Sequence, residues 1–437
     1  MKAAGRLSAA IEVLDDIINR HRPASVALHD WGRSHRFAGA GDRAAIGNLV
    51  YDALRQKASI AWRMNAETPR ALALGVMVFA WGEEAEKIAG LCDGSRFAPA
   101  PLAEGERKAL AIGTLEGAPG WVQADIPEWL EEAFEENFGE DYIDEGRALA
   151  RRPPTDFRVN SLKAQRDKLL VQLARFGVVP TPLSPLGIRI PPSQGPERTP
   201  NLQPEAPYQR GQLEVQDEGS QICSLLVYAR PGEQVLDYCA GAGGKTLALA
   251  AAMENRGQIF AHDADRNRLK PIYERLKRAG TRNVQVRGPD DPLEDLEGRM
   301  DRVVVDVPCS GSGVWRRRPD AKWRLTPDAL AKRQSEQENV FAQASRYVRP
   351  GGYLCYITCS MLAQENEGQV YAFLDAHPEF ELLSSGEVWE ELFAGAQLKP
   401  WSSDACSVTL TPAATGTDGF FFAVLERRSG RDGEEGA

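Results

Sequence analysis

The sequence predicts an α/β fold with a mostly parallel sheet, preceded by an all-helical region and a small α+β segment. From about residue 215 onward, apolar strand-like runs alternate with helical patterns, as is typical of βαβ units with helices on both faces of a sheet. In residues 1–90 the apolar side chains instead recur with a helical period. At 437 residues the chain is long enough for two or three domains.

The first half is predicted mainly as helices. One helix covers residues 7–19, and Asp42 is expected to cap a second that runs on to residue 64. A further acidic helical piece covers 126–154. The segment 155–180 reads as a strand followed by a helix, and the proline-rich segment 184–207 as a loop or edge strand.

The second half supplies the alternating pattern. We expect strands at 233–239, 257–263, 283–288, 301–308, 351–360 and 419–428. We expect helices at 245–253, 266–280, 326–348 and 365–378. The polar ending RRSGRDGEEGA is expected to be frayed. The predicted domains are a helical domain with an acidic linker (1–145), a small α+β segment (146–215) and a ligand-binding α/β domain (216–430).

Composition excludes several classes of protein. No apolar run is long enough for a transmembrane helix, and acidic residues interrupt the N-terminal apolar stretch, which argues against a signal peptide. The seven cysteines contain no C-x-x-C pair. Because no signal peptide and no transmembrane helix are predicted, we expect a cytoplasmic protein with reduced thiols and no membrane association. Because there is no C-x-x-C pair, we expect no metal site.

The net charge of −10 hides an uneven distribution. Residues 83–145 contain 4 Lys/Arg against 17 Asp/Glu, whereas 146–215 contain 11 against 5. An acidic segment thus masks basic ones, and RNA remains a candidate partner.

The stretch DYCAGAGGKT, residues 237–246, follows the first predicted strand of the α/β domain. It resembles a Walker A loop, but Cys239 stands where that loop has its first glycine, which disfavours a nucleoside triphosphate. The dinucleotide pattern G-x-G-x-x-G also fails, because Thr246 stands at its sixth place. Asp263, at the end of the next strand, is suited to binding ribose hydroxyls. NAD, FAD and S-adenosylmethionine are all compatible with such a site, and Asp290 or Asp291 is suited to binding the adenine amino group.

Two cysteines follow neighbouring strands, in DVPCSGSG and YITCSMLAQENE. Cys309 and Cys359 are therefore expected at the carboxyl edge of the sheet, beside the glycine-rich turn. A thiolate beside a methyl donor suits methylation of a pyrimidine at carbon 5, because addition at carbon 6 makes carbon 5 nucleophilic. Asp306 is placed to bind the ring nitrogen, and Lys245 to orient Asp306 or lower the pKa of a thiol. The residues alone do not distinguish the roles of the two cysteines.

These motifs resemble, in order, those of the RsmB/Sun-type RNA cytosine-C5 methyltransferases. The resemblance covers residues 150–428 and includes FRVNSLKAQRDKLL and GTDGFFFAVLERR. It implies a Rossmann-like class I methyltransferase domain that uses S-adenosylmethionine, with Cys359 as nucleophile and Cys309 promoting product release. The N-terminal helices resemble the NusB-like RNA-binding domain of the same family. The turn G-A-G-G departs from the family's A-P-G-G, the irregular GPDDP leaves Asp290 and Asp291 as alternatives, and the acidic segment is unexplained.

The residues expected at the site form three sets. The expected catalytic residues are Cys359, Cys309, Asp306 and Lys245. The expected cofactor-binding residues are Asp237, Cys239, Ala240, Gly241, Gly243, Gly244, Lys245, Asp263, Arg268, Asp290 and Asp306. The expected RNA-binding residues are Arg158, Asn160, Lys163, Arg316, Arg317 and Arg318, with Trp315 and Trp323 as candidates for base stacking.

The resemblance favours an enzyme that forms 5-methylcytosine in small-subunit (16S) ribosomal RNA, with the target base single-stranded or flipped. The sequence shows no obvious interface motif, so we expect a monomer. A transfer-RNA methyltransferase and a non-catalytic RNA-binding assembly factor remain as alternatives. The retention of both cysteines, Asp306 and Lys245 argues against the non-catalytic factor.

Overall fold

The structure is a computed structural model that describes residues 1–402 and 404–429. The predicted frayed end falls largely beyond residue 429, outside the described residues. The chain packs into two compact units. The helical unit consists of Met1–Pro153, Pro192–Pro200 and Trp315–Leu325. The α/β unit consists of Pro154–Pro191, Asn201–Val314 and the described residues from Thr326 on. The three domain ranges expected from the sequence stay a prediction.

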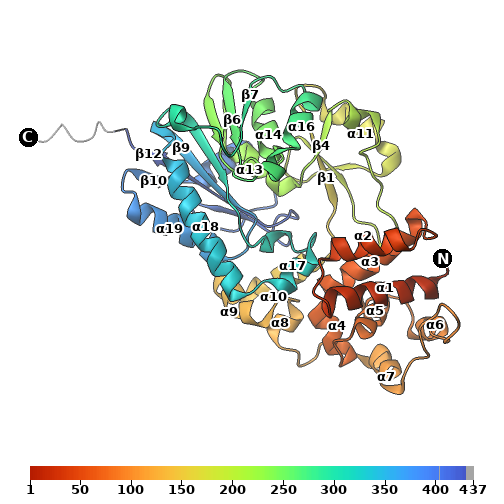
Figure 1. Cartoon of the computed structure of the whole chain (residues 1–437). Coiled ribbons are helices and arrows are strands. Elements are labelled where there is room, and N and C mark those ends of the chain that lie inside the picture. The colour runs from red at the N-terminus through yellow and green to blue at the C-terminus, as the bar shows by residue number, and fades with distance from the viewer. Residues whose placement is uncertain (403, 430–437) are drawn as a thin grey trace, which may run out of the picture. The chain divides into compact units, whose positions relative to one another are not determined.

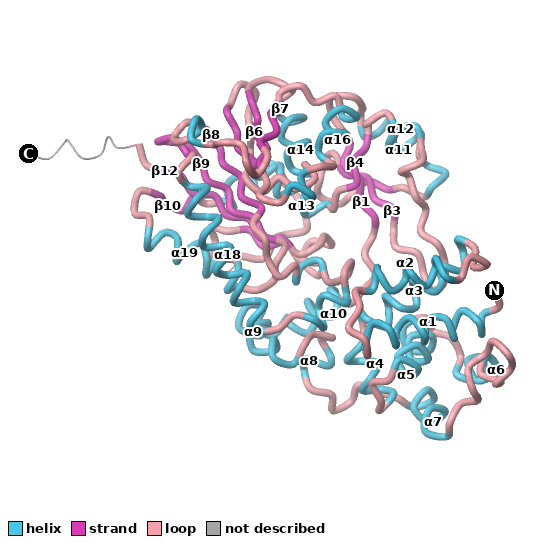
Figure 2. Tube along the Cα trace, viewed as in Figure 1, coloured by secondary structure: helices cyan, strands magenta, loops and turns pink. Residues whose placement is uncertain are grey.

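The helical unit contains no strand in the part of the chain that the structure describes, as Figure 2 shows. Its helices are α1 (Ala3–Ile18), α2 (Ala24–Ser34), α3 (Ala40–Arg55), α4 (Lys57–Met64), α5 (Pro69–Gly75), the π-helix η1 (Val76–Ala80), α6 (Ala85–Leu91), α7 (Glu104–Ile112), α8 (Gly120–Gln123), η2 (Glu128–Leu130), α9 (Glu131–Phe138), η3 (Gly139–Asp141), α10 (Tyr142–Leu149) and α17 (Pro319–Arg324). Leu7, Leu14, Leu49 and Leu72 are buried in its core. The predicted helical fold of this region is confirmed.

Two details of the helical prediction are wrong. Asp42 is not the N-cap of α3. The helix begins at Ala40 after Gly39, and the Asp42 carboxylate reaches back to accept the Gly39 N–H at 3.3 Å. The predicted helix to residue 64 is also broken at Gln56, whose φ and ψ of −111° and 34° separate α3 from α4.

A four-stranded antiparallel sheet opens the α/β unit, with strand order β2-β3-β1-β4. Its elements are β1 (Thr155–Val159), α11 (Arg166–Gln172), η4 (Ala174–Phe176), β2 (Val179–Pro180), β3 (Gly187–Ile190), α12 (Ala206–Gln209) and β4 (Leu213–Val215). The strand and helix predicted for 155–180 are confirmed. The alternatives of loop or edge strand are wrong for β3, which pairs on both sides. In that segment Pro185 lies before β3 and the other prolines come after Ile190, so none interrupts a hydrogen bond of β3.

The larger sheet has the order β10-β12-β9-β8-β5-β6-β7, with β11 paired to β12. Its strands are β5 (Gln234–Asp237), β6 (Gln258–His262), β7 (Val284–Arg287), β8 (Met300–Asp306), β9 (Val348–Thr358), β10 (Phe380–Leu383), β11 (Val408–Leu410) and β12 (Phe420–Arg427). Its helices are α13 (Glu218–Leu226), α14 (Gly244–Ala252), α15 (Arg266–Leu269), α16 (Ile272–Ala279), η5 (Glu294–Leu296), η6 (Ser312–Val314), α18 (Pro327–Ser345), η7 (Ala363–Glu365), α19 (Glu367–Ala376) and α20 (Ser385–Leu392). Strands β5 to β9 pair in parallel, and β10, β11 and β12 are antiparallel.

Helices cover both faces of this sheet (Figure 1). Alternate residues of β8 enter different cores, because successive strand side chains point to opposite faces. Val304 packs with residues of α13 and α14, whereas Val303 and Val305 pack with residues of α18 and α19. The predicted Rossmann-like fold with a mostly parallel sheet is confirmed. Strand order reverses between β5 and β8, where α/β proteins bind ligands at the carboxyl ends of their strands.

Candidate active site

The turn between β5 and α14 is shaped by glycines. Gly241 and Gly243 have φ values of +51° and +81°, in the left-handed region that favours glycine. A Cβ on Gly243 would lie 2.5 Å from Cγ1 of Ile272. The Gly241 N–H donates to Oδ2 of Asp263 at 2.9 Å, so the turn is tied to the end of β6. Asp263 is itself 3% exposed.

The other residues predicted for this turn lie around it. Ala240 is buried, and its N–H donates to the His262 carbonyl. Gly244 is the first residue of α14. Burial raises the pKa of the half-buried Cys239 thiol well above its ordinary value, with Asp306 adding to the effect. Arg268 is exposed, with Nη1 3.8 Å from Oδ2 of Asp263.

Asp237 ends β5 and has an unusual environment. Oδ2 accepts a 2.6 Å hydrogen bond from the Thr246 hydroxyl, while the buried Oδ1 has no hydrogen-bond partner. Burial raises the pKa of Asp237 from 3.8 to about 7. A free buried oxygen beside a glycine turn, with a second buried carboxylate at Asp263, fits the ammonium and ribose groups of S-adenosylmethionine.

Replacing Asp237 by asparagine is expected to change how stability depends on pH. The pKa of Asp237 is raised in the folded protein. Between about pH 4 and pH 7 the native state therefore keeps a proton that the unfolded state has already released. The contribution of this group to stability is therefore present below pH 4 and is lost as pH rises through 7. The thermal unfolding midpoint of Asp237→Asn, measured without cofactor, should increase relative to that of wild type as pH rises. A difference that stays constant with pH would contradict the assignment.

Asp290 and Asp291 follow β7 and line an open cavity of about 510 Å³. Its lining residues are Arg266, Asn267, Leu269, Lys270, Tyr273, Gly288, Pro289, Asp290 and Asp291. Asp290 pairs with Arg266. Asp291 accepts the Gly288 N–H at 2.6 Å. Both carboxylates thus remain candidates for the adenine contact, and the cavity includes neither cysteine.

The two cysteines meet where β8 and β9 end. These strands are parallel neighbours, with Asp306 opposite Ile357, so the loops that follow them emerge at the same edge. The Sγ atoms of Cys309 and Cys359 lie 3.3 Å apart, well beyond the disulfide length of about 2.05 Å. Hydrogen bonding to Cys359 and then burial raise the pKa of Cys309 well above its ordinary value.

Lys245 and Asp306 form an ion pair at the same edge. Lys245 Nζ donates to Asp306 Oδ2 at 2.7 Å, and the lysine is 7% exposed. Burial lowers the pKa of Lys245, but Asp306 and neighbouring thiols outweigh it, so the pKa is raised overall. Nζ also lies 5.3 Å from the centre of the Phe420 ring. Lys245 is therefore held as an ammonium ion that fixes the Asp306 carboxylate.

Glu365, which was not among the predicted site residues, lies beneath both cysteine loops. This fully buried carboxylate accepts hydrogen bonds from the Ser310 N–H at 2.7 Å and from the Ser310 and Ser360 hydroxyls at 2.5 Å each. Gln337 Nε2 adds a fourth at 2.9 Å. The only signal in the sequence is the acidic run ENE that follows the T-C-S motif.

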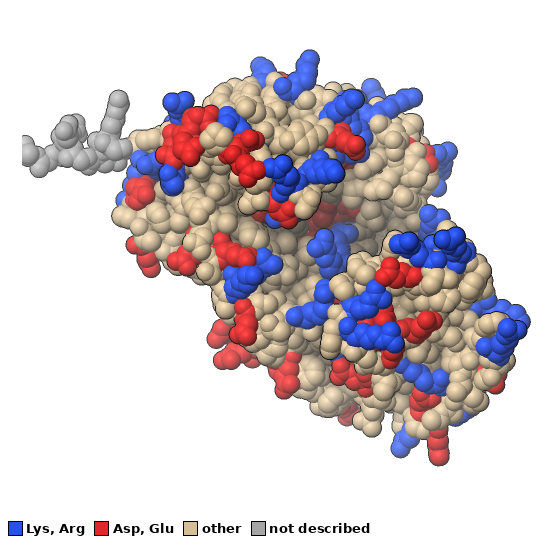
Figure 3. Space-filling model, viewed as in Figure 1, with Lys and Arg blue, Asp and Glu red and all other residues tan. Residues whose placement is uncertain are grey.

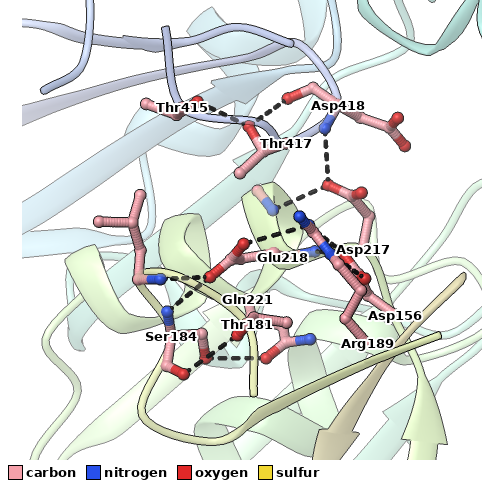
Figure 4. Close-up of polar contacts among 12 residues, drawn as sticks. Asp156, Thr181, Ser184, Arg189, Asp217, Glu218, Gln221, Thr415, Thr417 and Asp418 are labelled. Carbon is pink, nitrogen blue, oxygen red and sulfur yellow. Dashed lines mark hydrogen bonds and ion pairs between the residues drawn. The ribbon is translucent and has the colours of Figure 1, made fainter. Parts of the chain in front are cut away.

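The closing motif GTDGFFF fastens the cysteine loops. The Gly419 N–H donates to the Gly313 carbonyl at 2.8 Å, and the Gly313 N–H donates to the Cys359 carbonyl at 2.9 Å. A Cβ on Gly313 would lie 2.2 Å from the Gly419 carbonyl oxygen, so this close approach requires glycine. One residue earlier, the Asp418 N–H donates to Asp217 at 3.1 Å (Figure 4).

A buried ionic network joins the four-stranded sheet to α13 (Figure 4). Arg189 on β3 makes a two-pronged contact with Asp156 on β1, at 2.7 and 2.8 Å. The same guanidinium reaches Glu218 at 3.2 Å. Glu218 also accepts the N–H groups of Leu183 and Ser184, each at 2.7 Å. The small sheet is thereby anchored to the helix next to the candidate active site.

Arg158 and Asn160, which were predicted to contact RNA, are each only 3% exposed in this structure, and a contact of either with RNA stays a prediction. Arg158 Nε donates to Gln216 at 2.6 Å. Asn160 Nδ2 donates to the carbonyls of Gly211 and Ala279 at 2.9 and 2.8 Å. Both residues therefore stabilise the α/β unit internally. Lys163 is exposed and stays a prediction.

The basic segment 315–324 belongs to the helical unit. Trp315 is fully buried and stacks on Phe134 with ring centres 6.0 Å apart. Arg316 is 5% exposed, so these two residues do not offer the stacking face and surface charge that the sequence suggested. Trp323 is partly buried, with Nε1 donating to the Leu54 carbonyl at 2.6 Å. Arg317 and Arg318 remain accessible and stay predictions.

Buried Lys322 secures this segment to the helices. Its Nζ donates to the carbonyls of Arg55 and Asp125 at 2.8 and 2.5 Å. Burial lowers the pKa of Lys322 to about 8. Elsewhere on the helical unit, basic side chains gather over α2 on the face shown in Figure 3, with acidic ones among them.

Two structural absences apply to the described residues. In 1–402 and 404–429, no helix is both long and apolar enough to cross a lipid bilayer. Within the same ranges, no group of three or more His, Cys, Asp or Glu side chains is arranged to hold a metal ion.

Comparison with known proteins gives concordant matches. Residues 224–426 match the family described as 16S rRNA methyltransferase RsmB/F, and residues 126–193 match the RsmF/B-like ferredoxin-like domain. The ribosomal RNA small subunit methyltransferase B of Sodalis glossinidius is 33% identical over 68% of this chain and 65% of its own length. The probable enzyme of that name from Synechocystis is 30% identical over 70% of this chain and 67% of its own length. The crystal structure of PH0851 covers 98% of this chain and 99% of its own, at 26% identity and a TM-score of 0.72. The chain thus spans just under two thirds of the Sodalis relative.

Proposed function

We propose that this chain methylates carbon 5 of a cytosine in small-subunit ribosomal RNA, with S-adenosylmethionine as methyl donor. The chain belongs to the RsmB/F methyltransferase family. The observation that carries the proposal is the pair of thiols 3.3 Å apart at the strand ends. The Lys245–Asp306 pair belongs to the same edge. Cytosine-C5 chemistry uses a nucleophile and a second group that assists elimination, and two neighbouring thiols supply both.

The chain's own residues would act in sequence. The Cys359 thiolate adds to carbon 6, which forms a C–S bond and makes carbon 5 nucleophilic. A proton shared between Asp306, which Lys245 holds in place, and the ring nitrogen would offset the electron density that this nitrogen gains. Bound S-adenosylmethionine would supply an electrophilic methyl group to carbon 5, and its sulfur would leave as a neutral thioether. Loss of the carbon 5 proton to a base and cleavage of the C–S bond then restore the aromatic ring and the Cys359 thiolate, with Cys309 assisting this release.

We also propose the state of the enzyme, its compartment and the way in which it holds RNA. The enzyme would act as a monomer with reduced thiols, in the cytoplasm where ribosomal RNA is made. The target cytosine must be single-stranded or flipped to reach half-buried thiols. The NusB-like character of the helical unit and RNA binding by Lys163, Arg317 and Arg318 belong to the proposal as well.

The test is identification of the methylated nucleoside. Purified protein is incubated with labelled S-adenosylmethionine and either unmodified 16S ribosomal RNA or transfer RNA, and the digested RNA is analysed by chromatography and mass spectrometry. We expect 5-methylcytosine from ribosomal RNA. Label confined to transfer RNA would move the substrate to that class. Cofactor and RNA binding without label in either RNA would favour a non-catalytic assembly factor.

A further inference from the structure

Among the described residues, one carboxylate contacts both the residue that follows Cys309 and the residue that follows Cys359. This carboxylate is that of Glu365. Ser310 follows Cys309 and Ser360 follows Cys359, and both serine hydroxyls donate to Glu365 Oε2 at 2.5 Å. The backbone N–H of Ser310 donates to the other oxygen at 2.7 Å. With no exposed surface, Glu365 cannot exchange these donors for water. A buried carboxylate satisfied in this way fixes the geometry of the groups that satisfy it.

The support below Glu365 is equally dense. Gln337 on α18 donates from the same Nε2 to Glu365 at 2.9 Å and to the Pro308 carbonyl at 3.0 Å. The Tyr356 hydroxyl donates to the backbone carbonyl of Glu365 at 2.8 Å. The position of the carboxylate is therefore set by α18 and β9, and it transmits that position to both loops.

The charges around the two thiols differ. Glu365 is among the groups that raise the pKa of Cys309, after the hydrogen bond to Cys359, burial and the charge of Cys359. Cys309 is in turn among the groups that raise the pKa of the buried Tyr356 hydroxyl. Cys359 in turn is among the groups that raise the pKa of Lys245 against the effect of burial. A thiolate at Cys309 is thus opposed by a carboxylate, whereas a thiolate at Cys359 is attracted by an ammonium ion.

We propose that Glu365 is a positioning residue that assigns the roles of the two cysteines. It holds their loops in register, and its buried carboxylate opposes a negative charge at Cys309, so that attack falls to Cys359. This inference deepens the proposed function and rests on it for the chemistry of attack. The proposed asymmetry between the thiols would be a property of the free protein, so it can be measured without RNA or cofactor.

The test is the pH profile of Cys309 alkylation. Iodoacetamide labelling of Cys309 is followed by peptide mass spectrometry in a Cys359→Ser background, with and without Glu365→Gln. Glutamine keeps the shape of the side chain and removes its charge. We expect Glu365→Gln to move the alkylation midpoint of Cys309 down by about one pH unit or more. An unchanged or higher midpoint would overturn the proposal.

Glu365→Asp is the matched variant, because it keeps the charge while shortening the side chain. In Glu365→Asp the alkylation midpoint of Cys309 should equal that of the Cys359→Ser parent. A fall equal to that of Glu365→Gln would assign the effect to packing and overturn the proposal. Thermal unfolding checks that each variant is folded before its midpoint is compared with that of the parent. A wild type without methyl transfer would refute the proposed function while leaving these midpoints interpretable.

Discussion

Exchange of Cys309 for alanine is expected to trap a covalent protein–RNA complex that survives denaturing electrophoresis. If Cys359 is the nucleophile, the C–S bond to carbon 6 still forms in Cys309→Ala, but its cleavage loses the assistance of the neighbouring thiol at 3.3 Å. The adduct should accumulate on incubation with S-adenosylmethionine and unmodified 16S ribosomal RNA. Turnover should fall by about 10³-fold or more, as is usual when one member of a catalytic unit is removed.

Cys359→Ala distinguishes the two roles. It should form no adduct and transfer no methyl group, and the double variant Cys309→Ala/Cys359→Ala should behave in the same way. Cys406→Ala is the matched control, because Cys406 is also half-buried and free but lies before β11. It should retain wild-type turnover. Adduct accumulation in Cys359→Ala with none in Cys309→Ala would exchange the roles proposed for the two residues.

The alternating fold could be predicted from the sequence because its strands are uninterrupted apolar runs. The run VVV in β8 is buried on both faces, which is why it reads as a central strand. The elements β10, α20 and β11 were not predicted. Strand β10 has only four residues, with Glu381 exposed, and it is held by pairing to β12 rather than by its own pattern.

Some residues of the candidate site could be predicted from the sequence, because a local pattern determines their position at a strand end. Cys309 lies three residues after β8 and Cys359 directly follows β9, so the topology of the sheet places both at one edge. Glu365 was not accessible in this way, because its importance depends on donors from distant segments, such as Gln337 on α18. Arg158 shows the opposite failure. A basic residue is assumed to be exposed, but here tertiary packing buries it against Gln216.

Loss of Arg189 is expected to destabilise the α/β unit by about 3 to 5 kcal/mol, because breaking a buried ionic network leaves uncompensated charge. The side chains of Asp156 and Glu218 have no exposed surface, and Arg189 is 13% exposed. In Arg189→Met the two carboxylates would face each other across β1 and α13 without a cation. Urea unfolding followed by fluorescence should show an earlier transition for the variant.

The control is an arginine of similar chemistry outside the network. Arg175 pairs with Glu205 at 2.6 Å but is 69% exposed, so Arg175→Met should cost no more than about 1 kcal/mol. The triple variant Arg189→Met/Asp156→Asn/Glu218→Gln should recover much of the stability lost in Arg189→Met, because it removes the uncompensated charges along with the cation. If the triple variant were as unstable as Arg189→Met, the stabilisation would lie in the shape of the guanidinium and its hydrogen bonds, and charge compensation would not explain the anchoring of the small sheet to α13.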